Sequence, residues 1–375
     1  MMMKGIAKRA LTPILVTLSL AVFTSCLSAP VDFDEATWRK SIDETKPELL
    51  YAPHNHAGRF HNPWARMPET GFLTVLRWRL FTRASTVYTD EERAHLPAFV
   101  PDARARMAKH ADRDYILWIG HNSFAVKIGD TLYVTDPMLS NRAVIIKRKV
   151  PPAITAAELA AAAPRMVVII THNHHDHLDR DTVRALPESA RFIVPRGVGE
   201  LIRKYGKRDI VELDWWREAE LGAGVRIACV PAQHWSRRID QGTNRSLWAG
   251  FVLIAPKTKI LFAGDSGYFA GYREIGRKFP GIDYAFMPIT AFHPRWFMHY
   301  AHMNVDEALR AFDETGARYF IPTQWGTFPL GEEPVGYAAL ALKRAIARRG
   351  LDPSRFVVMD IGGIEPVRSF RHKTN

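Results

Sequence analysis

Cysteine is almost absent from this 375-residue chain, which contains only two. Two thiols cannot build a disulfide framework or a cysteine-rich zinc site. Long apolar runs are missing as well, since none reaches the roughly 18 residues that a membrane span requires. Acidic residues are fewer than basic residues, 39 against 51, which gives a formal charge of +12. This excess of positive charge indicates an anionic partner without identifying it. With 47% hydrophobic residues, the composition is that of a globular protein with one large domain, or one domain plus an extension.

The first residues of the chain have the pattern of an export signal. Three basic residues precede an apolar run over residues 11–23, and small residues stand directly before Cys26. This order is typical of a secretory signal peptide over residues 1–25. The small residues before Cys26 resemble a bacterial lipobox, in which that cysteine is lipidated, although Phe23 stands where leucine is usual. We therefore predict a membrane-anchored lipoprotein of the bacterial cell envelope, on the outer membrane or the periplasmic face, with secretion without lipid as the alternative.

Cleavage before Cys26 would remove three basic and no acidic residues, so the charge would fall from +12 to +9. The other cysteine, Cys229, lies in a strand pattern over residues 225–230, and we predict a buried core residue rather than a nucleophile. Residues 26–110 lack strong strand alternation and are predicted to be an N-terminal extension that packs on the core. Within it, a helix is predicted over residues 72–83, whose apolar face either covers the main domain or touches a membrane.

Residues 111–375 alternate short apolar runs with helical segments, which is typical of a layered α/β domain. Strands are predicted over residues 132–135, 167–170, 225–230, 260–263 and 319–322. Asn304 and Glu307 form a capping-box pattern that opens a helix, and Gly316 is placed to end it. A second helix is predicted between residues 334 and 350.

The strand over residues 167–170 ends in a dense run of ionisable side chains with the pattern H-x-H-x-D-H. Such a run is costly after a core strand unless a metal ion neutralises the carboxylate and takes up the imidazole lone pairs. His172 and His174 lie two residues apart and can point to one ion, whereas the adjacent Asp176 and His177 can turn to a second. Nitrogen and oxygen ligands without cysteine suit zinc, with iron or manganese as further options.

The other predicted strands also end in polar residues. Asp136, His234, Asp265 and Gln324 follow the strands over residues 132–135, 225–230, 260–263 and 319–322. Each alone is an ordinary loop residue, but sites on α/β scaffolds are built where strand ends meet at one edge of a sheet. We therefore expect these residues to lie close to the histidine run.

The order of these residues resembles that of the metallo-β-lactamase superfamily. Longer motifs narrow the resemblance to N-acyl-phosphatidylethanolamine-hydrolysing phospholipase D and its bacterial relatives, over about residues 58–330. These motifs are Gly58–Phe60, Asn62–Trp64, Gly120–His121, Thr135–Pro137, Thr171–Asp179, Pro231–Trp235, Phe262–Tyr268, Pro294–Met298 and Trp325–Phe328. The resemblance implies an α/β fold, a four-layer αββα sandwich, with a two-zinc site between its sheets.

Carried over by position, the resemblance implies which residues hold each zinc ion. One ion would be held by His172, His174 and His234 and the other by Asp176 and His177, with Asp265 bridging both. The last ligand of the family is a histidine before Trp-Gly-Thr-Phe, whereas this chain has Gln324 there. Because a neutral amide oxygen is a weaker zinc ligand than imidazole, we expect the second metal to bind loosely, to be a harder ion or to be partly absent.

The resemblance also implies a reaction: phospholipase D-type hydrolysis of N-acyl-phosphatidylethanolamine or a related phospholipid. The attacking group would be a metal-bridging hydroxide held by Asp265, with Asp176 as a further catalytic residue. His302 matches a family histidine near the substrate head group and would assist the leaving group. A lone histidine near a helix start is as often a cap or a surface residue, so both roles stay open for His302.

Four more residues are expected to support the site. Asp136 and Asp179 would orient ligand imidazoles, and Arg295 and Trp296 would contact the phosphate or the acyl chain. The expected partners are the phospholipid substrate and a membrane surface, met through the lipid anchor and a basic face. Nucleic acid is not expected for an exported protein, and a dimer is one possibility for the oligomeric state.

Two alternative functions stay open at this point. The same site could cleave lactones, β-lactams or thioesters, which other members of the superfamily hydrolyse. Alternatively, the chain is a non-catalytic envelope protein in which Gln324 marks a decayed second metal site. The four intact ligands between residues 172 and 177 argue against decay, and the longer motifs favour the phospholipase-like branch.

Overall fold

A computed structural model of the chain describes residues 33–68, 73–74, 76, 78 and 86–368. The predicted export signal, Cys26 and most of the helix predicted over residues 72–83 lie outside the described residues. Among the residues that are described, no helix is both long enough and apolar enough to cross a membrane.

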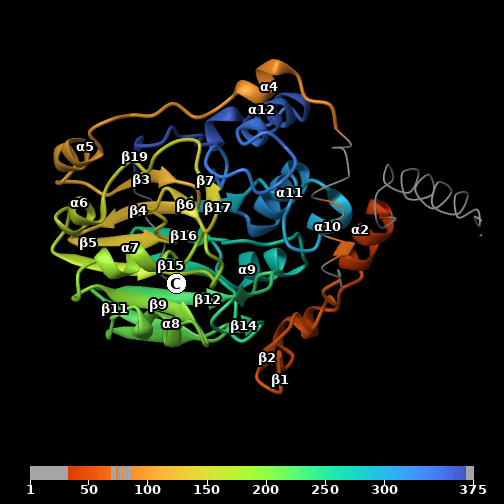
Figure 1. Cartoon of the computed structure of the whole chain (residues 1–375), viewed down its shortest axis with the longest axis horizontal. Helices are drawn as coiled ribbons and strands as arrows, with labels where there is room; N and C mark the ends of the chain where they lie inside the picture. The colour runs from red at the N-terminus through yellow and green to blue at the C-terminus, as the bar shows by residue number, and fades with distance from the viewer. Residues whose placement is uncertain (1–32, 69–72, 75, 77, 79–85, 369–375) are drawn as a thin grey trace, which may run out of the picture.

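Two β-sheets form the centre of the molecule (Figure 1). The seven-stranded sheet has the order β10-β9-β8-β5-β4-β3-β19, and the six-stranded sheet the order β11-β12-β15-β16-β17-β18. The strands of the first sheet are β3 Tyr115–Gly120, β4 Ser123–Ile128, β5 Thr131–Thr135, β8 Arg165–Ile169, β9 Arg191–Pro195, β10 Ile210–Leu213 and β19 Ile364–Pro366. Those of the second are β11 Glu218–Gly222, β12 Val225–Val230, β15 Gly250–Ala255, β16 Thr258–Phe262, β17 Tyr284–Pro288 and β18 Tyr319–Thr323.

Strand directions bring the carboxyl ends of several strands to the same edge of each sheet. In the first sheet, β8 runs parallel to β5 and β9. In the second, β12 and β16 both pair antiparallel with β15 and therefore point the same way, and β17 and β18 continue parallel to β16. The polar residues that follow β5, β8, β12, β16 and β18 are consequently gathered where these strands end.

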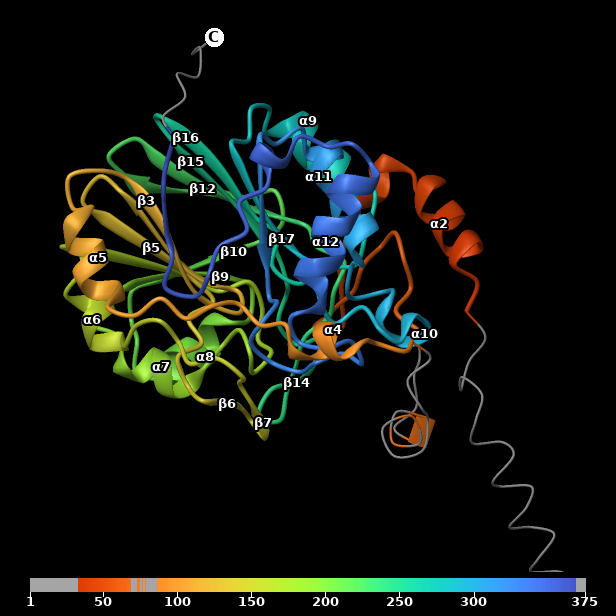
Figure 2. The same cartoon turned by 90° about the horizontal axis from the view of Figure 1, so that it is seen from above.

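Alternation along the strands explains the four layers. In β3, Ile116 and Trp118 belong to the core between the sheets, whereas Leu117 and Ile119 face the core beneath the helices of the first sheet. Both faces of the sheet are therefore apolar and covered. The first sheet carries α6 Ala156–Ala160, α7 Arg180–Ala185 and α8 Gly199–Lys204, and the second α9 Gly271–Lys278, α11 Val305–Thr315 and α12 Tyr337–Arg348. Figure 2 shows α7 and α8 on one side of the sheets and α9, α11 and α12 on the other, which confirms the predicted αββα sandwich.

The predicted elements of the core are present with small shifts at their ends. Each of the five predicted strands is found, and β12 has the predicted bounds. The Asn304–Glu307 capping box opens α11, and Gly316 ends it in the left-handed conformation with φ of 64°. The helix predicted between residues 334 and 350 is α12, and Cys229 is buried in the core between the sheets. These predictions are confirmed.

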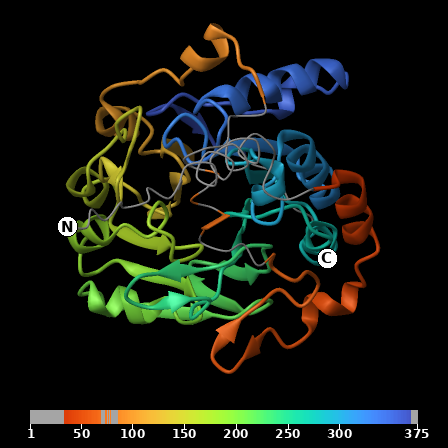
Figure 3. The ribbon, with the colours of Figure 1, turned by 45° about the vertical axis from the view of Figure 1, so that its right-hand side comes forward.

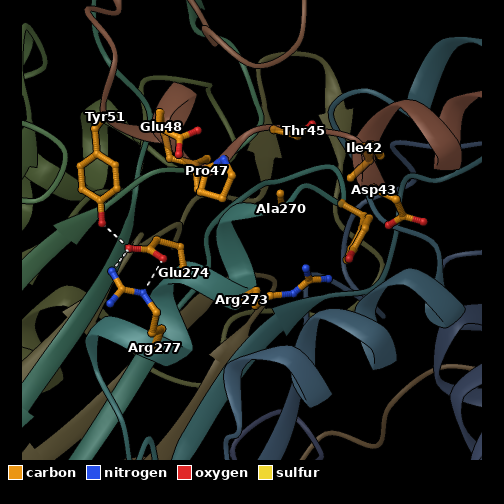
Figure 4. A pocket seen from close by; sticks show the side chains of 12 residues that line it. Ile42, Asp43, Thr45, Pro47, Glu48, Tyr51, Ala270, Arg273, Glu274 and Arg277 are labelled. Carbon is orange, nitrogen blue, oxygen red and sulfur yellow. Dashed lines mark hydrogen bonds and ion pairs between the residues drawn. The ribbon is translucent and has the colours of Figure 1, made fainter.

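The N-terminal segment, drawn in red and orange in Figure 3, runs along the outside of the molecule beside the helices of the second sheet. Its elements before the gap at residue 69 are α2 Glu35–Asp43, the 3₁₀ helix η1 Pro47–Tyr51, β1 Asn55–His56 and β2 Arg59–Phe60. Tyr51 donates a hydrogen bond to Glu274 of α9, which also pairs with Arg277 at 2.6 Å (Figure 4). These side chains border a cavity of about 450 Å³ between the segment and α9. After the gap, α4 Asp90–Ala94 and α5 Ala103–Lys109 lead into β3.

Candidate metal centre

The histidine run follows β8 in a tight turn at the edge of the first sheet. The amides of His177 and Leu178 both donate to the carbonyl of His174, so the backbone turns back on itself within the run. Asp179 then caps the N-terminus of α7. Because the turn is fixed at both ends, the side chains of the run have defined directions.

Four residues from three strand ends form the first ligand cluster. The ligand atoms of His172, His174, His234 and Asp265 lie within 4.8 Å of one another. His174 Nδ1 lies 2.9 Å from His172 Nε2 and 3.2 Å from His234 Nε2. The predicted convergence of the ends of β8, β12 and β16 is therefore present in the fold.

The second cluster adjoins the first and contains His121, Asp176 and His177. Asp176 Oδ2 lies 3.1 Å from His121 Nε2 and 3.4 Å from His177 Nε2. Asp265 reaches both clusters, since its Oδ1 is 2.9 Å from His177 Nε2 and its Oδ2 is 3.7 Å from His234 Nε2. The carboxylate of Asp265 thus lies where a bridging ligand is expected.

The chemistry of these groups fits a metal ion. Burial lowers the pKa of His174 to about 4, so its imidazole is neutral and keeps a free lone pair. Its Nε2 is buried and has no hydrogen-bond partner among the residues that the structure describes. Burial raises the pKa of Asp265, but the charge and hydrogen bond of His177 outweigh it and hold that pKa well below its usual range. The first cluster thus combines neutral imidazoles with an ionised carboxylate, which is the donor set of zinc, iron and manganese sites.

Asp136 supports the second cluster from the end of β5. Its Oδ2 lies 2.7 Å from His177 Nδ1, and it accepts further hydrogen bonds from the Asn122 side chain and the Thr171 hydroxyl, both at 2.7 Å. A carboxylate held in this way fixes the imidazole with its other nitrogen toward the cluster. Its position is the one predicted for a residue that orients a ligand.

Asp179 does not contact a ligand imidazole, and this part of the prediction is wrong. Its carboxylate accepts hydrogen bonds from the Ser140 hydroxyl at 2.6 Å and from the Thr182 hydroxyl at 2.5 Å, and it caps α7 through the amide of Asp181. Because α7 begins immediately after the ligand run, the Asp179 side chain serves as the N-cap of this helix instead of orienting an imidazole.

Arg295 and Trp296 were expected to contact substrate, but the structure places both in packing and ion-pair contacts. Arg295 pairs with Glu35 of α2 at 3.0 Å and with Glu307 of α11 at 2.7 Å, and it donates to the carbonyl of His302 at 3.3 Å. Trp296 is buried and meets Trp78 edge-on. Two acidic neighbours already satisfy the guanidinium, so Arg295 braces the loop that carries His302.

His302 and Gln324 both lie in the centre. The His302 ring is 5.3 Å from that of His234, and its buried Nδ1 has no hydrogen-bond partner within the described part of the chain. Gln324 has a left-handed backbone with φ of 73°, and its side-chain amide donates to Asp265 Oδ1. Gln324 therefore occupies the expected ligand position but turns its nitrogen toward the bridging carboxylate.

His121 is the ligand candidate that the sequence reasoning missed. It lies in the turn between β3 and β4 with φ of 55°, and Thr327 accepts a hydrogen bond from its amide at 2.8 Å. The Gly120–His121 pair stood out as a motif, but a lone histidine some fifty residues before the run carries no ligand spacing. The signal that could have found it resembles the one used for β12: a buried strand followed by a histidine, which comes directly after β3 for His121 and four residues after β12 for His234.

A cavity of about 450 Å³ borders the first cluster at His234. It is lined by His234, Trp248 and Tyr300 together with residues 61–63 and 65–67 of the N-terminal segment. Asn62 joins the two parts, since its side-chain amide donates to the His234 carbonyl at 3.1 Å and to the Tyr300 hydroxyl at 2.7 Å. The N-terminal segment thus forms one wall of a cavity beside the first cluster, whereas the cavity at α9 touches no residue of either cluster.

Residues 131–325, just over half of the chain, match the family described as "Beta-lactamase superfamily domain". The chain belongs to the beta-lactamase superfamily. It is 32% identical over 273 residues to N-acyl-phosphatidylethanolamine-hydrolyzing phospholipase D 1 of Caenorhabditis elegans, covering 67% of this chain and 75% of that protein. It is 30% identical over 220 residues to a metal-dependent hydrolase of Pyrobaculum calidifontis, covering 57% of this chain and 85% of that protein.

The fold is shared with solved metallo-hydrolases. The structure of Igni18, a metallo hydrolase from Ignicoccus hospitalis, matches with a TM-score of 0.54 and 23% identity, covering 68% of this chain and 98% of that one. Together with the two clusters, these similarities identify the chain as a metal-dependent hydrolase of the metallo-β-lactamase fold.

Proposed function

We propose that this chain is a zinc-dependent phospholipase D-type phosphodiesterase that hydrolyses N-acyl-phosphatidylethanolamine or a related phospholipid. The observation that carries the proposal is the pair of adjoining ligand clusters that share Asp265. It is supported by the identity of 32% to the phospholipase D of Caenorhabditis elegans that hydrolyses N-acyl-phosphatidylethanolamine.

Zinc ions in the two clusters would polarise the phosphoryl oxygens and lower the pKa of a water molecule. The chain itself fixes the ligands for this task. His172 Nδ1 lies 3.0 Å from the Thr171 hydroxyl, and His234 Nδ1 lies 3.1 Å from the Ala301 carbonyl. With Nδ1 engaged, each ring turns Nε2 toward the first cluster. Asp136 does the same for His177 in the second cluster.

His302 is the residue that we assign to proton transfer to the leaving group. Its ring lies beside His234, its Nδ1 is without a partner among the described residues, and Arg295 holds its backbone carbonyl. In hydrolysis, the oxygen of water joins phosphorus while the bond from phosphorus to the hydroxyl oxygen of the N-acylethanolamine breaks. The water gives up one proton in this step, and we assign to the His302 imidazole the transfer of that proton to the departing oxygen.

A substrate panel tests the reaction. The purified protein is loaded with zinc and incubated with N-acyl-phosphatidylethanolamine, phosphatidylethanolamine, a bis-nitrophenyl phosphodiester, a lactone, a β-lactam and a thioester. We expect phosphatidic acid and N-acylethanolamine from the first substrate, and ¹⁸O from labelled water in the phosphatidic acid. Cleavage of only the lactone, the β-lactam or the thioester would contradict the proposal and favour another hydrolase, and no cleavage at all would favour the non-catalytic alternative.

The ligand run itself provides a matched pair of variants. His172→Ala removes a member of the first cluster, whereas His175→Ala removes a half-buried histidine that belongs to neither cluster. We expect the first variant to lose metal and to lose activity by at least about 100-fold, and the second to keep both. Equal effects of the two substitutions would contradict the assignment of the clusters.

We also propose that residues 1–25 direct export and that Cys26 carries the lipid anchor, with the protein acting at the cell envelope. The pattern of basic, apolar and small residues before Cys26 supports this. The test is the mass of the mature N-terminal peptide after expression in a bacterial host. We expect diacylated Cys26 at the N-terminus and a soluble periplasmic product from Cys26→Ser; an unprocessed N-terminus would contradict the proposal.

A further inference from the structure

Two aliphatic side chains are exposed at the tip of a short hairpin near the metal centre. The hairpin consists of β6 Arg142–Ala143 and β7 Ile146–Lys147, joined by the two residues Val144 and Ile145. The side chains of these two residues are 58% and 80% exposed. Burial of large aliphatic groups is the main driving force of folding, so a turn that leaves both in water gains nothing from them within this chain.

The turn is also unfavourable for the backbone. Val144 has φ of 56°, a left-handed conformation that β-branched residues rarely adopt. Two-residue hairpin turns with positive φ at the first central residue alone normally carry glycine there, often followed by a polar residue. The chain therefore accepts both strain and exposed apolar surface at the same two residues, and such costs persist where a partner needs them.

Charge around the tip indicates what that partner is. Arg142, Lys147 and Lys149 flank the tip and are exposed, and residues 137–157 contain no aspartate or glutamate. Arg142 also donates a hydrogen bond to the Ile145 carbonyl at 2.9 Å, so this carbonyl has a partner when water is excluded. An aliphatic tip ringed by basic side chains matches the interface of an anionic bilayer, where acyl chains lie beneath phosphate groups.

The base of the hairpin is attached to the wall of the second ligand cluster. The amide of Lys149 donates to the Thr327 carbonyl at 2.8 Å, and the Arg148 guanidinium lies 5.2 Å from the centre of the Phe328 ring. Phe328 in turn meets His121 edge-on at 5.2 Å. A membrane or other surface that binds the hairpin tip would therefore lie close to the metal centre.

A second hairpin repeats the feature on the side of the first cluster. It consists of β13 Arg237–Arg238 and β14 Gly242–Thr243, and Ile239 in its loop is 95% exposed. Figure 2 shows β7 and β14 at the same edge of the molecule. Asn244, directly after β14, lines the cavity that borders His234, and the amide of Arg237 donates to Asn173 in the ligand run at 2.9 Å. Two exposed aliphatic tips thus lie at the same edge of the molecule, on hairpins that adjoin the metal centre.

We propose that the β6–β7 hairpin inserts Val144 and Ile145 into an anionic phospholipid bilayer and so docks the metal centre on its surface, with Ile239 as a second contact. The docking itself is independent of the reaction, and only the statement that the bilayer supplies the substrate rests on the proposed function. A docked site receives a lipid substrate directly from the membrane.

A fluorophore at the tip tests insertion directly. The full chain with Cys26→Ser and Ile145→Cys is labelled with the environment-sensitive dye NBD, and Val358→Cys, at an exposed valine outside both hairpins, is the matched control. Cys229 is fully buried and does not compete for the label. With vesicles of phosphatidylglycerol and phosphatidylcholine we expect a blue shift at position 145, quenching by nitroxide lipids, and neither effect at position 358. Absence of shift and quenching at position 145 would overturn the proposal, even if the protein binds vesicles through another segment.

The double variant Val144→Gly with Ile145→Asn separates docking from catalysis. Gly-Asn suits this turn, so the melting temperature should be unchanged or higher. We expect vesicle affinity and hydrolysis of vesicle phospholipid to fall at least tenfold, with hydrolysis of the soluble bis-nitrophenyl phosphodiester unchanged. If the tip inserts but no phospholipid is cleaved, the proposed function fails and docking stands. If vesicle binding is unchanged in the double variant while a dimer of the parent chain dissociates, docking is overturned and the tip is a contact between copies.

Discussion

At the scale of single residues, two aspartates close to the ligand run have different tasks. Asp136 holds His177 Nδ1 at 2.7 Å, whereas Asp179 caps α7 and binds hydroxyls. We predict that Asp136→Asn weakens metal binding at the second cluster by about 10- to 100-fold, because the amide can present its donor to His177 and favour the wrong tautomer. Isothermal titration with zinc on metal-free protein measures the effect.

Asp179→Asn is the matched control for that measurement. Asparagine is also a good N-cap, so we expect an unfolding free energy lower by no more than about 1 kcal/mol and unchanged zinc affinity. Similar losses of metal affinity in both variants would contradict the separate roles of Asp136 and Asp179.

Gln324 is the residue at which this chain departs from the pattern of its relatives. Its side-chain nitrogen faces Asp265, next to the second cluster. We predict that Gln324→His tightens the second metal by at least about tenfold, since imidazole is a better zinc ligand than an amide. Metal content after dialysis should rise toward two ions per chain. Unchanged content would show that this position is not a ligand, and Gln324→Glu would then serve to ask whether charge alone matters.

The sequence predicted the ligands that stand in a run or directly after a clear apolar strand. The spacing of His172, His174 and His177 predicts that they are ligands. Asp265 was predicted because it follows an apolar strand. His121 was missed as a ligand because its contact with Asp176 spans 55 residues and depends on how the β3–β4 turn packs. The ion pairs of Arg295 were equally invisible, since Glu35 lies 260 residues away.

At the scale of elements, Arg295 connects α2, α11 and the loop of His302. It pairs with Glu35 and Glu307, and burial raises the pKa of Glu307. We predict that Arg295→Met lowers the unfolding free energy by about 3 kcal/mol, because Glu307 is left buried without its cation. With His302 no longer braced, kcat on the soluble phosphodiester should fall about tenfold at unchanged KM.

Glu35→Gln is the milder partner of this test. Glu35 is more exposed than Glu307, so its loss should cost less than about 1 kcal/mol and leave kcat unchanged. Denaturant titration and steady-state kinetics give both quantities. If Arg295→Met changes KM rather than kcat, Arg295 contacts the substrate, and its proposed role in bracing the His302 loop is wrong.

Asp214, after β10, holds the N-terminal segment through His54 at 2.7 Å and binds Arg196 at 2.8 Å. Burial raises the pKa of Asp214, but the hydrogen bonds of His54 and Arg196 outweigh it and lower the pKa to about 2. Because the folded-state pKa is depressed, this stabilisation is complete above the unfolded pKa of about 3.9 and is lost as pH falls through about 2. We predict that Asp214→Asn lowers stability at pH 7 and flattens the decline between about pH 4 and pH 2, as measured by urea unfolding across pH.

The core elements were predictable and the N-terminal segment was not, for the same physical reason. β8, β12 and β18 are buried on both faces and appear as apolar runs in the sequence. The segment over residues 35–62 is held by single buried side chains such as Ile42, Leu50 and Phe60 and by isolated polar contacts such as those of Tyr51 and Asn62. Such contacts join distant parts of the chain and leave no periodic pattern to read.

At the scale of the whole molecule, the two sheets act as separate supports that meet at the metal centre. The first cluster takes its histidines from β8 and β12, which belong to different sheets, and Asp265 comes from β16. The alternation in β3 shows why the sheets stack, but strand order cannot be read from one sequence. The order of the four layers was predicted from the family resemblance. The ligands of the metal centre come together only when the two sheets pack against each other.

Metal ions that join two sheets should therefore stabilise the entire fold. Since an ion that binds only the folded chain adds RT ln(1 + [M]/Kd), zinc at about 100 times Kd contributes about 2.7 kcal/mol. We predict that removal by a chelator lowers the melting temperature by several degrees and that added zinc restores it. His175→Ala should respond like the parent chain, whereas a variant with both His172→Ala and Asp176→Asn should melt at the same temperature with and without the chelator. If the chelator does not change the melting temperature of the parent chain, the two ligand clusters do not hold the sheets together through metal.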